Sequence, residues 1–81
     1  MTTQELEQEL CTLFAELLGI PEVDPADSFF DLGGHSLLAS RLARRIHTVY
    51  GTRTPIRRIY SAPTAESLAR YLSASALAEG A

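Results

Sequence analysis

Lysine is absent from this chain, and no arginine occurs before residue 36 either. Residues 1–35 therefore carry a charge of −8 from eight acids, whereas residues 36–81 carry +5 from seven arginines and two acids. Such a division within one short chain predicts separate surfaces of opposite sign. The net charge of −3 argues against a nucleic-acid partner, because nucleic acid selects a basic protein.

Cysteine occurs once, at Cys11, so an internal disulfide is excluded and a reducing compartment is expected. No apolar run is long enough to cross a membrane, and the acidic start MTTQELEQEL lacks the basic residues and apolar stretch of a signal peptide. The two histidines and the scattered acids lack the spacing of metal ligands. These absences predict a cytoplasmic domain with no membrane contact and no metal.

The length and the apolar pattern predict one small all-α domain. A chain of 81 residues buries a compact core but leaves little room for a walled-in active site. No strand signal and no internal repeat occurs. We expect helices at about residues 3–18 and 36–50, a short helical turn at 54–60 and a last helix within 62–72. The fold class is therefore a small bundle of three main helices plus a short fourth helix.

Local signals mark the ends of these helices. Thr2 and Glu5 fit a capping box before the first helix, and Gly19 and Gly51 fit helix stops. Thr64 is expected to cap the last helix. The side chains that helical spacing directs to the core are Leu6, Leu10, Leu13, Phe14, Leu17, Leu38, Ala39, Leu42, Ile46, Val49, Leu68, Tyr71 and Leu72.

A long connection, GIPEVDPADSFFDLGGH, separates the first two helices at residues 19–35. Its apolar residues are too many to leave in water, so we expect the segment to be ordered and pinned across the core. These residues are Ile20, Val23, Phe29, Phe30 and Leu32. A connection longer than about twelve residues in a compact domain is usually functional, which directs attention to its end, at Ser36.

Ser36 has two interpretations. As a helix N-cap it would be structural, and its removal would cost about 1 kcal/mol. As a modified residue it would profit from Gly33 and Gly34, which carry no side chains to shield it, and from the helix N-terminus, which suits a phosphate ester. Leu37 shares a helix side with Arg41 and Arg44, so an apolar side chain should be exposed beside the serine.

Catalysis by Ser36 itself is disfavoured. The stretch GHSLL begins like a nucleophile elbow but lacks the final glycine and a preceding strand. His35, the next residue in sequence, points elsewhere in general, and His47 lies about three helical turns away. No sheet is predicted that would hold a base and an oxyanion site. We therefore expect no catalytic residue in this chain.

The stretch DLGGHSLLASRLARRI at residues 31–46, together with DSFFDLGGHSL and APTAESLARYL, resembles peptidyl carrier (thiolation) domains of nonribosomal peptide synthetases, within the acyl-carrier-protein-like family. The resemblance covers nearly the whole chain. It implies that Ser36 receives 4'-phosphopantetheine covalently from coenzyme A, within a motif that includes Gly33, Gly34, His35 and Leu37. The thiol of this group then holds an aminoacyl or peptidyl thioester.

The resemblance also implies the partners of the domain. They are a phosphopantetheinyl transferase with coenzyme A, an adenylation domain, a condensation domain and a thioesterase. We expect a monomeric, non-catalytic carrier at residues 1–75, followed by a tail or linker at 76–81, that binds neither nucleic acid nor membrane. The partner surface is assigned to Leu37, Arg41, Arg44, Ile59 and Tyr60.

The residues around Ser36 distinguish between kinds of carrier. Carriers of fatty acid synthesis have an acidic second helix and an aspartate before the serine, whereas here His35 precedes Ser36 and the helix is basic. This favours a peptidyl carrier, although the arginines are also compatible with a solvated face. A histidine at this position resembles carriers that deliver to ordinary condensation or termination partners and not to epimerisation domains.

Two other classes of function are weighed against the carrier. One is a docking or scaffold bundle in which Ser36 is only a cap. The other is a nucleic-acid binder that uses the arginine-bearing helix, which the acidic half disfavours. Acceptance of phosphopantetheine by Ser36 distinguishes the carrier from both.

Overall fold

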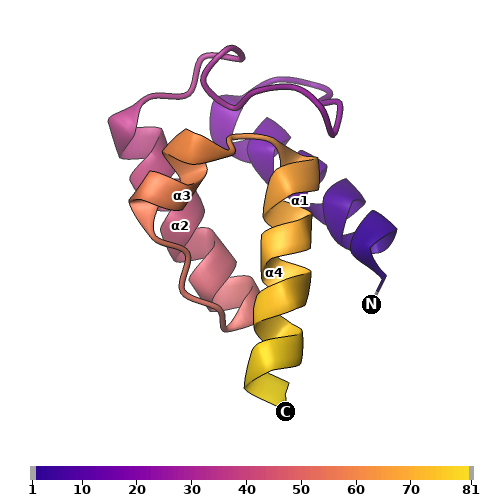
Figure 1. The fold of residues 1–81 in the computed structure, drawn as a ribbon. Helices are drawn as coiled ribbons and strands as arrows, with labels where there is room; N and C mark the ends of the chain where they lie inside the picture. Colours follow the sequence, from indigo (N-terminus) through magenta and orange to yellow (C-terminus); the bar gives the residue numbers. More distant parts are fainter. Residues whose placement is uncertain (1, 81) are drawn as a thin grey trace.

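The computed structural model contains four helices and one long connection (Figure 1). It describes the backbone of residues 2–80 and the side chains of residues 2–74. The helices are α1 (Thr3–Leu18), α2 (Ser36–Tyr50), α3 (Ile56–Ser61) and α4 (Ala65–Gly80). Residues 2–80 contain no strand beyond an isolated bridge between the connection and the start of α4. The predicted all-α bundle with one short helix is confirmed.

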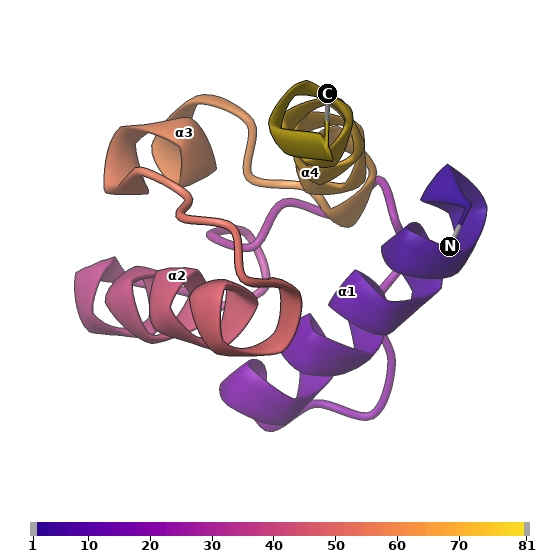
Figure 2. The same cartoon turned by 90° about the horizontal axis from the view of Figure 1, so that it is seen from below.

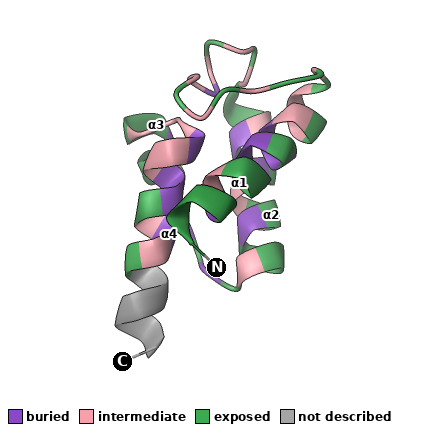
Figure 3. Cartoon of the chain, turned by 90° about the vertical axis from the view of Figure 1, so that its right-hand side faces the viewer, coloured by how far each residue is buried: buried purple, intermediate pink, exposed green. Residues whose placement is uncertain are grey.

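The helices pack in two pairs. α4 lies along α1, and α3 packs against α2, while α2 also contacts α1. Figure 2 shows α2 and α3 together on the left side of the bundle, with α1 and α4 on the right. In Figure 3 the buried parts of the helices face one another, and the outer sides are exposed.

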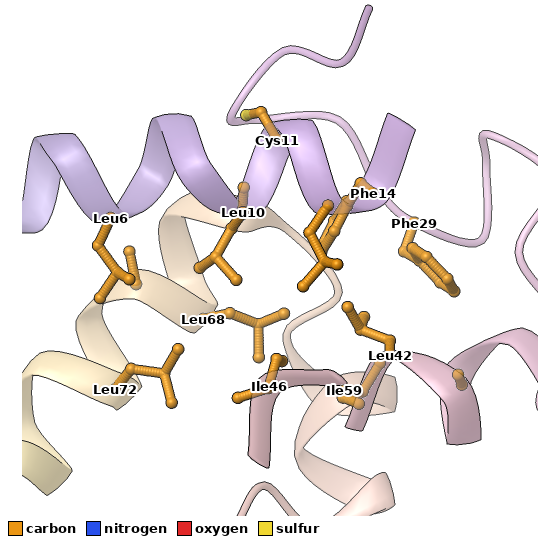
Figure 4. Close-up of a cluster of buried hydrophobic side chains, with 14 residues drawn as sticks. Leu6, Leu10, Cys11, Phe14, Phe29, Leu42, Ile46, Ile59, Leu68 and Leu72 are labelled. Atoms are coloured by element: carbon orange, nitrogen blue, oxygen red, sulfur yellow. The ribbon is translucent and has the colours of Figure 1, made fainter. Parts of the chain in front are cut away.

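The core lies between the four helices and includes one aromatic side chain from the connection (Figure 4). Full burial of an aliphatic or aromatic side chain contributes about 1.5–3 kcal/mol, so this cluster dominates the stability of the domain. Its members are Leu6, Leu10, Cys11, Leu13, Phe14, Phe29, Ala39, Leu42, Ile46, Ile59, Ala65, Leu68, Ala69 and Leu72.

The predicted core is largely confirmed, with one clear exception. Val49 is 56% exposed, although helical spacing places it on the buried face of α2. It lines a shallow groove beside Glu9 and Glu16 of α1. The neighbours of Val49 on α1 therefore include charged side chains, which do not bury it. Leu17, Leu38 and Tyr71 pack against the core and remain partly buried, as do several connection residues.

The predicted caps are present. The Glu5 N–H donates to Thr2 Oγ1 at 3.1 Å at the start of α1, and the Ser67 N–H donates to Thr64 Oγ1 at 3.2 Å at the start of α4. Gly19 ends α1 with a φ of 68°, a conformation that glycine adopts without steric cost. Both ends of α1 and the start of α4 therefore follow from local sequence.

Residues 19–35 are held against the bundle, as predicted. Phe29 is fully buried in the core. Two backbone hydrogen bonds join the connection to the segment around the start of α4, from the Phe29 N–H to the Pro63 carbonyl at 2.7 Å and from the Glu66 N–H to the Pro25 carbonyl at 3.1 Å. These contacts place the end of the connection, and so the start of α2, relative to the core.

Two helix boundaries differ from the prediction. α3 begins at Ile56 after Pro55, which occupies the cap position, so Thr54 lies outside the helix. α4 continues to Gly80 and not to residue 72, because Ala, Leu and Glu, which have high helix propensity, follow. Side chains after residue 74 and all of Ala81 lie outside the described part of the chain. A domain boundary at residue 75 and a tail at 76–81 therefore stay predictions.

In the part of the chain that the structure describes, no helix combines the length and apolar character that a membrane span requires.

Candidate functional site

Ser36 is the first residue of α2, and its side chain is exposed. The cap position of α2 is taken by His35, which has an extended backbone (φ −143°, ψ −178°) and makes no side-chain cap hydrogen bond. The interpretation of Ser36 as an N-cap is therefore wrong. The extended residue that precedes the helix is the histidine, so the serine hydroxyl lies one position too late to cap the first turn.

The two glycines before Ser36 serve different purposes. Gly33 has a φ of 109° with open space around it, so its role is conformational. Gly34 donates from its N–H to the Phe29 carbonyl at 2.9 Å, and a Cβ at this position would lie 2.6 Å from that oxygen and overlap the Phe29 ring. Gly34 therefore permits close packing on the core, a role that the prediction of simple access to Ser36 did not include.

An aromatic series runs from the core to Ser36. Phe14 and Phe29 meet edge to face with ring centroids 5.0 Å apart, and Phe29 and Phe30 do so at 5.7 Å. Phe30 stacks on Tyr60 of α3 at 4.8 Å with parallel rings. The Tyr60 hydroxyl donates a hydrogen bond to Ser36 Oγ at 3.0 Å.

Sequence reasoning missed this series. Its members come from α1, the connection and α3, so no helical period relates them. One signal was available, since the chain has only three phenylalanines and three tyrosines. The series uses four of these six rings. With so few aromatic residues in the chain, a cluster formed by several of them is a candidate for a structural role at the core.

Four of the five residues predicted for the partner surface are exposed, and their role in partner binding stays a prediction. Leu37 is 58% exposed and Tyr60 is 48% exposed, and Arg41 and Arg44 are exposed on α2. Ile59 is fully buried, so its assignment to the surface is wrong.

The α3 residue that is exposed instead is Ile56, at 37%. Ile56 and Tyr60 stand four positions apart and share a helix side, whereas Ile59 lies on the side that packs against α2.

Two arginines contact other helices and are not simply part of a solvent-facing helix surface. Arg45 pairs with Glu16 of α1 at 3.1 Å, and Arg58 lies over the Tyr71 ring at 4.8 Å from its centroid. Both contacts join neighbouring helices. Because the Arg45–Glu16 pair is half exposed, its contribution to stability is at most about 1 kcal/mol.

The sequence profile of a family described as "Phosphopantetheine attachment site" matches residues 8–72. The matched segment contains α2, α3, the connection and most of α1. The chain belongs to this family.

Curated relatives of this carrier domain are nonribosomal peptide synthetases. A probable synthetase from Salinispora arenicola, CymA, is 54% identical over 66 residues, which is 82% of this chain and 1% of the relative. A dimodular nonribosomal peptide synthase from Bacillus subtilis is 52% identical over 66 residues, again 82% of this chain and 3% of the relative. The chain therefore spans a small part of these relatives.

Solved structures of carrier proteins share the fold. One is a peptidyl carrier protein in a complex of the phosphopantetheine transferase Sfp with coenzyme A, with a TM-score of 0.83 and 30% identity over 85% of this chain and 90% of the other. Another is the A-PCP protein McyG complexed with phenylalanyl-adenylate, with a TM-score of 0.79 and 29% identity over 84% of this chain and 11% of the other. The chain is thus a carrier domain of the peptidyl type, which is non-catalytic and bears 4'-phosphopantetheine.

The surroundings of Ser36 agree with a carrier that is modified from outside. Among the described side chains, Tyr60 is the one that hydrogen-bonds to the Ser36 hydroxyl, and it does so as the donor, so it does not accept the Ser36 proton in this arrangement. A groove of about 820 Å³ lies between α1 and the connection and is not lined by Ser36. No group of three metal-ligating residues occurs within the described chain.

Cys11 lines that groove from the far side of α1 (Figure 4). Its side chain is buried and packs in the core cluster. Burial raises the pKa of the Cys11 thiol, and the nearby carboxylates of Asp24, Glu7 and Asp27 raise this pKa further. Because the thiolate is the nucleophile, the raised pKa makes Cys11 less able than the phosphopantetheine thiol to take up an acyl group.

The residues at the start of α2 fit a phosphate ester on Ser36. The first turn of a helix presents backbone N–H groups without intrahelical partners and the positive end of the helix dipole. No acidic residue occupies the first turn of α2, so nothing in that turn repels an anion. The Tyr60 hydroxyl adds a donor at the serine oxygen.

Proposed function

We propose that Ser36 carries 4'-phosphopantetheine and that the domain holds aminoacyl and peptidyl groups as thioesters during nonribosomal peptide synthesis. The observation that carries this assignment is the exposed hydroxyl at the first position of α2, within the segment that matches the attachment-site family. When bound, the group supplies a thiol on a long flexible arm. The domain supplies a fixed point of attachment and a surface for its partners.

The proposed partners act in sequence. A phosphopantetheinyl transferase with coenzyme A modifies Ser36, an adenylation domain loads the thiol, and a condensation domain takes the acyl group. A thioesterase releases the final product. The solved complex with a transferase and coenzyme A supports the first of these partners by similarity, and the structure of an A-PCP protein with phenylalanyl-adenylate supports the second. The relatives from Salinispora and Bacillus support a place in nonribosomal peptide synthesis.

The proposal also covers the compartment, the oligomeric state and the bounds of the carrier. The carrier works in the cytoplasm, where coenzyme A and aminoacyl adenylates are made, and it works as a monomer. Residues 1–75 form the carrier, and 76–81 form its tail or linker. The acidic half of the chain supports the expectation that nucleic acid is not a partner.

The test is intact-mass analysis after incubation with coenzyme A and a broad-specificity phosphopantetheinyl transferase. Three chains are compared: the parent, Ser36→Ala, and Ser40→Ala, which removes another exposed serine of α2. We expect one phosphopantetheine on the parent and on Ser40→Ala, and none on Ser36→Ala. Because Ser36 caps nothing, Ser36→Ala should lose less than about 1 kcal/mol of stability in thermal unfolding.

Modification of Ser36→Ala at the parent level would place the attachment elsewhere in the chain. A folded parent that gains no mass, having been shown to be unmodified at the start, would overturn the carrier assignment and favour a docking bundle.

A further inference from the structure

The phenol of Tyr60 is in a position to control the orientation of the Ser36 hydroxyl. Its O–H donates to Ser36 Oγ at 3.0 Å, across the gap between α3 and α2. We propose that Tyr60 is a positioning residue for the modification of Ser36, an inference that rests on the proposed function. The role is assigned to the hydroxyl, and the Tyr60 ring belongs to the exposed surface described above.

The phenol is held in place by the core. The Tyr60 ring stacks on Phe30 with an interplanar angle of 1°, and Phe30 meets the fully buried Phe29. Ile59, its neighbour in α3, is fully buried as well. An aromatic side chain has few rotatable bonds, so a stacked ring loses little further entropy when its hydroxyl forms a hydrogen bond. The donor is therefore preorganised although its surroundings are open to solvent.

The hydrogen bond has a direction that matters for chemistry. In the modification, Ser36 Oγ forms a bond to the phosphorus of coenzyme A that carries the pantetheine, and adenosine 3′,5′-bisphosphate leaves with the electron pair of the broken P–O bond. The Ser36 hydrogen leaves to a base of the transferase. Because Oγ accepts from Tyr60, the hydrogen of Ser36 is free to point toward that base. A donor aimed at Oγ also stabilises the negative charge that develops there.

The same donor fits the product. An esterified Ser36 oxygen has no hydrogen and only accepts, and a neighbouring phosphodiester is negatively charged. A phenol O–H at this place donates to either kind of oxygen, whereas a phenolate would be repelled.

Tyr60→Phe isolates the hydroxyl, because it keeps the ring, its stack on Phe30 and the exposed apolar surface. Tyr50→Phe is the matched control. The Tyr50 hydroxyl donates to a carboxylate oxygen of Glu9 at 2.9 Å, so this change also removes a tyrosine hydrogen bond between two helices while leaving Ser36 untouched. Both variants are checked for an unchanged helical fold by circular dichroism.

The first measurement is the steady-state rate of modification by a phosphopantetheinyl transferase with coenzyme A. For Tyr60→Phe we expect kcat/KM to fall by about 3- to 10-fold, the factor that one hydrogen bond of ordinary strength supports. The loss should lie mainly in kcat, because the docking surface is intact. Tyr50→Phe should keep the parent value.

The second measurement does not depend on turnover. The phosphorus-31 chemical shift of the modified chain, recorded at one fixed pH near neutrality, should differ between the parent and Tyr60→Phe, because the Tyr60 O–H lies beside the esterified oxygen. Modified Tyr50→Phe should keep the parent shift.

The outcomes separate the two proposals. A parent chain that accepts no phosphopantetheine overturns the proposed function and this inference together. A parent that is modified, with Tyr60→Phe equal to it in rate and in phosphorus-31 chemical shift, overturns the role of Tyr60 alone. A change confined to KM also overturns it, because that result assigns the hydroxyl to docking.

Discussion

At the scale of single residues, Ser36 is distinguished by the source of its hydrogen bond. A capping serine accepts from the backbone of its own helix, whereas Ser36 Oγ accepts from Tyr60 of another helix. The hydroxyl therefore contributes little to the stability of α2. It is exposed and oriented, which is what a modifying enzyme requires of its acceptor.

The two glycines before Ser36 lead to a prediction about coupling. Gly34→Ala should cost about 1–3 kcal/mol, because its Cβ meets the Phe29 ring and carbonyl. Phe29→Leu removes the ring and should relieve part of this clash. The two changes should therefore be non-additive by at least about 0.5 kcal/mol in urea unfolding.

Gly33→Ala is the control for this cycle. It meets no atom within 4 Å but strains a backbone with a φ of 109°, and its cost should add to that of Phe29→Leu. Additivity in both pairs would show that Gly34 does not pack against Phe29 in solution.

Much at the residue scale is predictable because it is local. The caps at Thr2 and Thr64 and the exposure of Leu37 follow from residues within one or two helical turns. The Tyr60 contact with Ser36 joins residues 24 positions apart. No spacing rule encodes such a contact, because it depends on how α3 is placed against α2.

At the scale of elements, α3 is the helix that most needs an anchor. It has six residues, far fewer than an isolated helix requires in water. Its one buried residue is Ile59, which packs in the core beside α2 and so fixes the place of Tyr60. The sequence predicted the existence of this helix but not which of its apolar residues faces inward.

Ile59→Ala should therefore be costly, with a loss of about 2–5 kcal/mol in unfolding free energy and slower modification of Ser36. Ile56→Ala is the matched control, since Ile56 is 37% exposed and its truncation should cost less than about 1 kcal/mol. Chemical denaturation of the two variants makes the comparison. Equal losses of unfolding free energy in the two variants would show that Ile59 is not buried, as its assignment to the partner surface had implied.

The other elements show where sequence patterns are sufficient. The bounds of α1 were predicted from a capping threonine and a terminal glycine, and the structure agrees. The burial of Phe29 in the connection was expected from its apolar character. The start of α3 was displaced by two residues because a proline is tolerated both at the cap and in the first turn.

At the scale of the whole molecule, the division of charge is preserved as a division between elements. α1 and the connection contain no basic residue other than histidine, whereas six of the seven arginines lie between residues 41 and 58. Leu37 is exposed beside Ser36 on α2, and Arg41 follows one helical turn later. We therefore expect a partner at Ser36 to meet an apolar side chain next to a positive charge.

Leu37→Glu should lower kcat/KM for modification by about tenfold or more, as expected when a central apolar contact is replaced by a charge. Stability should hardly change, because Leu37 is 58% exposed. Val49→Glu provides the control, since Val49 is 56% exposed at the other end of α2. Melting temperature and modification rate are measured for both. A large loss of melting temperature in Leu37→Glu alone, with a normal rate, would show that Leu37 is structural.

The family and the helical layout were predictable from the whole sequence, because one motif and the apolar periods carry them. What the sequence did not predict is how the site is joined to the core. That link uses four aromatic rings from three separate segments, and only the packed molecule brings them together.

The central claim is that the phosphopantetheine is attached to Ser36, and fragment mass spectrometry of the modified chain tests it most directly. Residues 1–41 form one tryptic peptide, because Arg41 is the first basic cleavage site. This peptide also contains Ser28 and Ser40, so its fragmentation distinguishes among possible acceptors. We predict that the added mass lies on Ser36. Its localisation to any other residue would contradict the account.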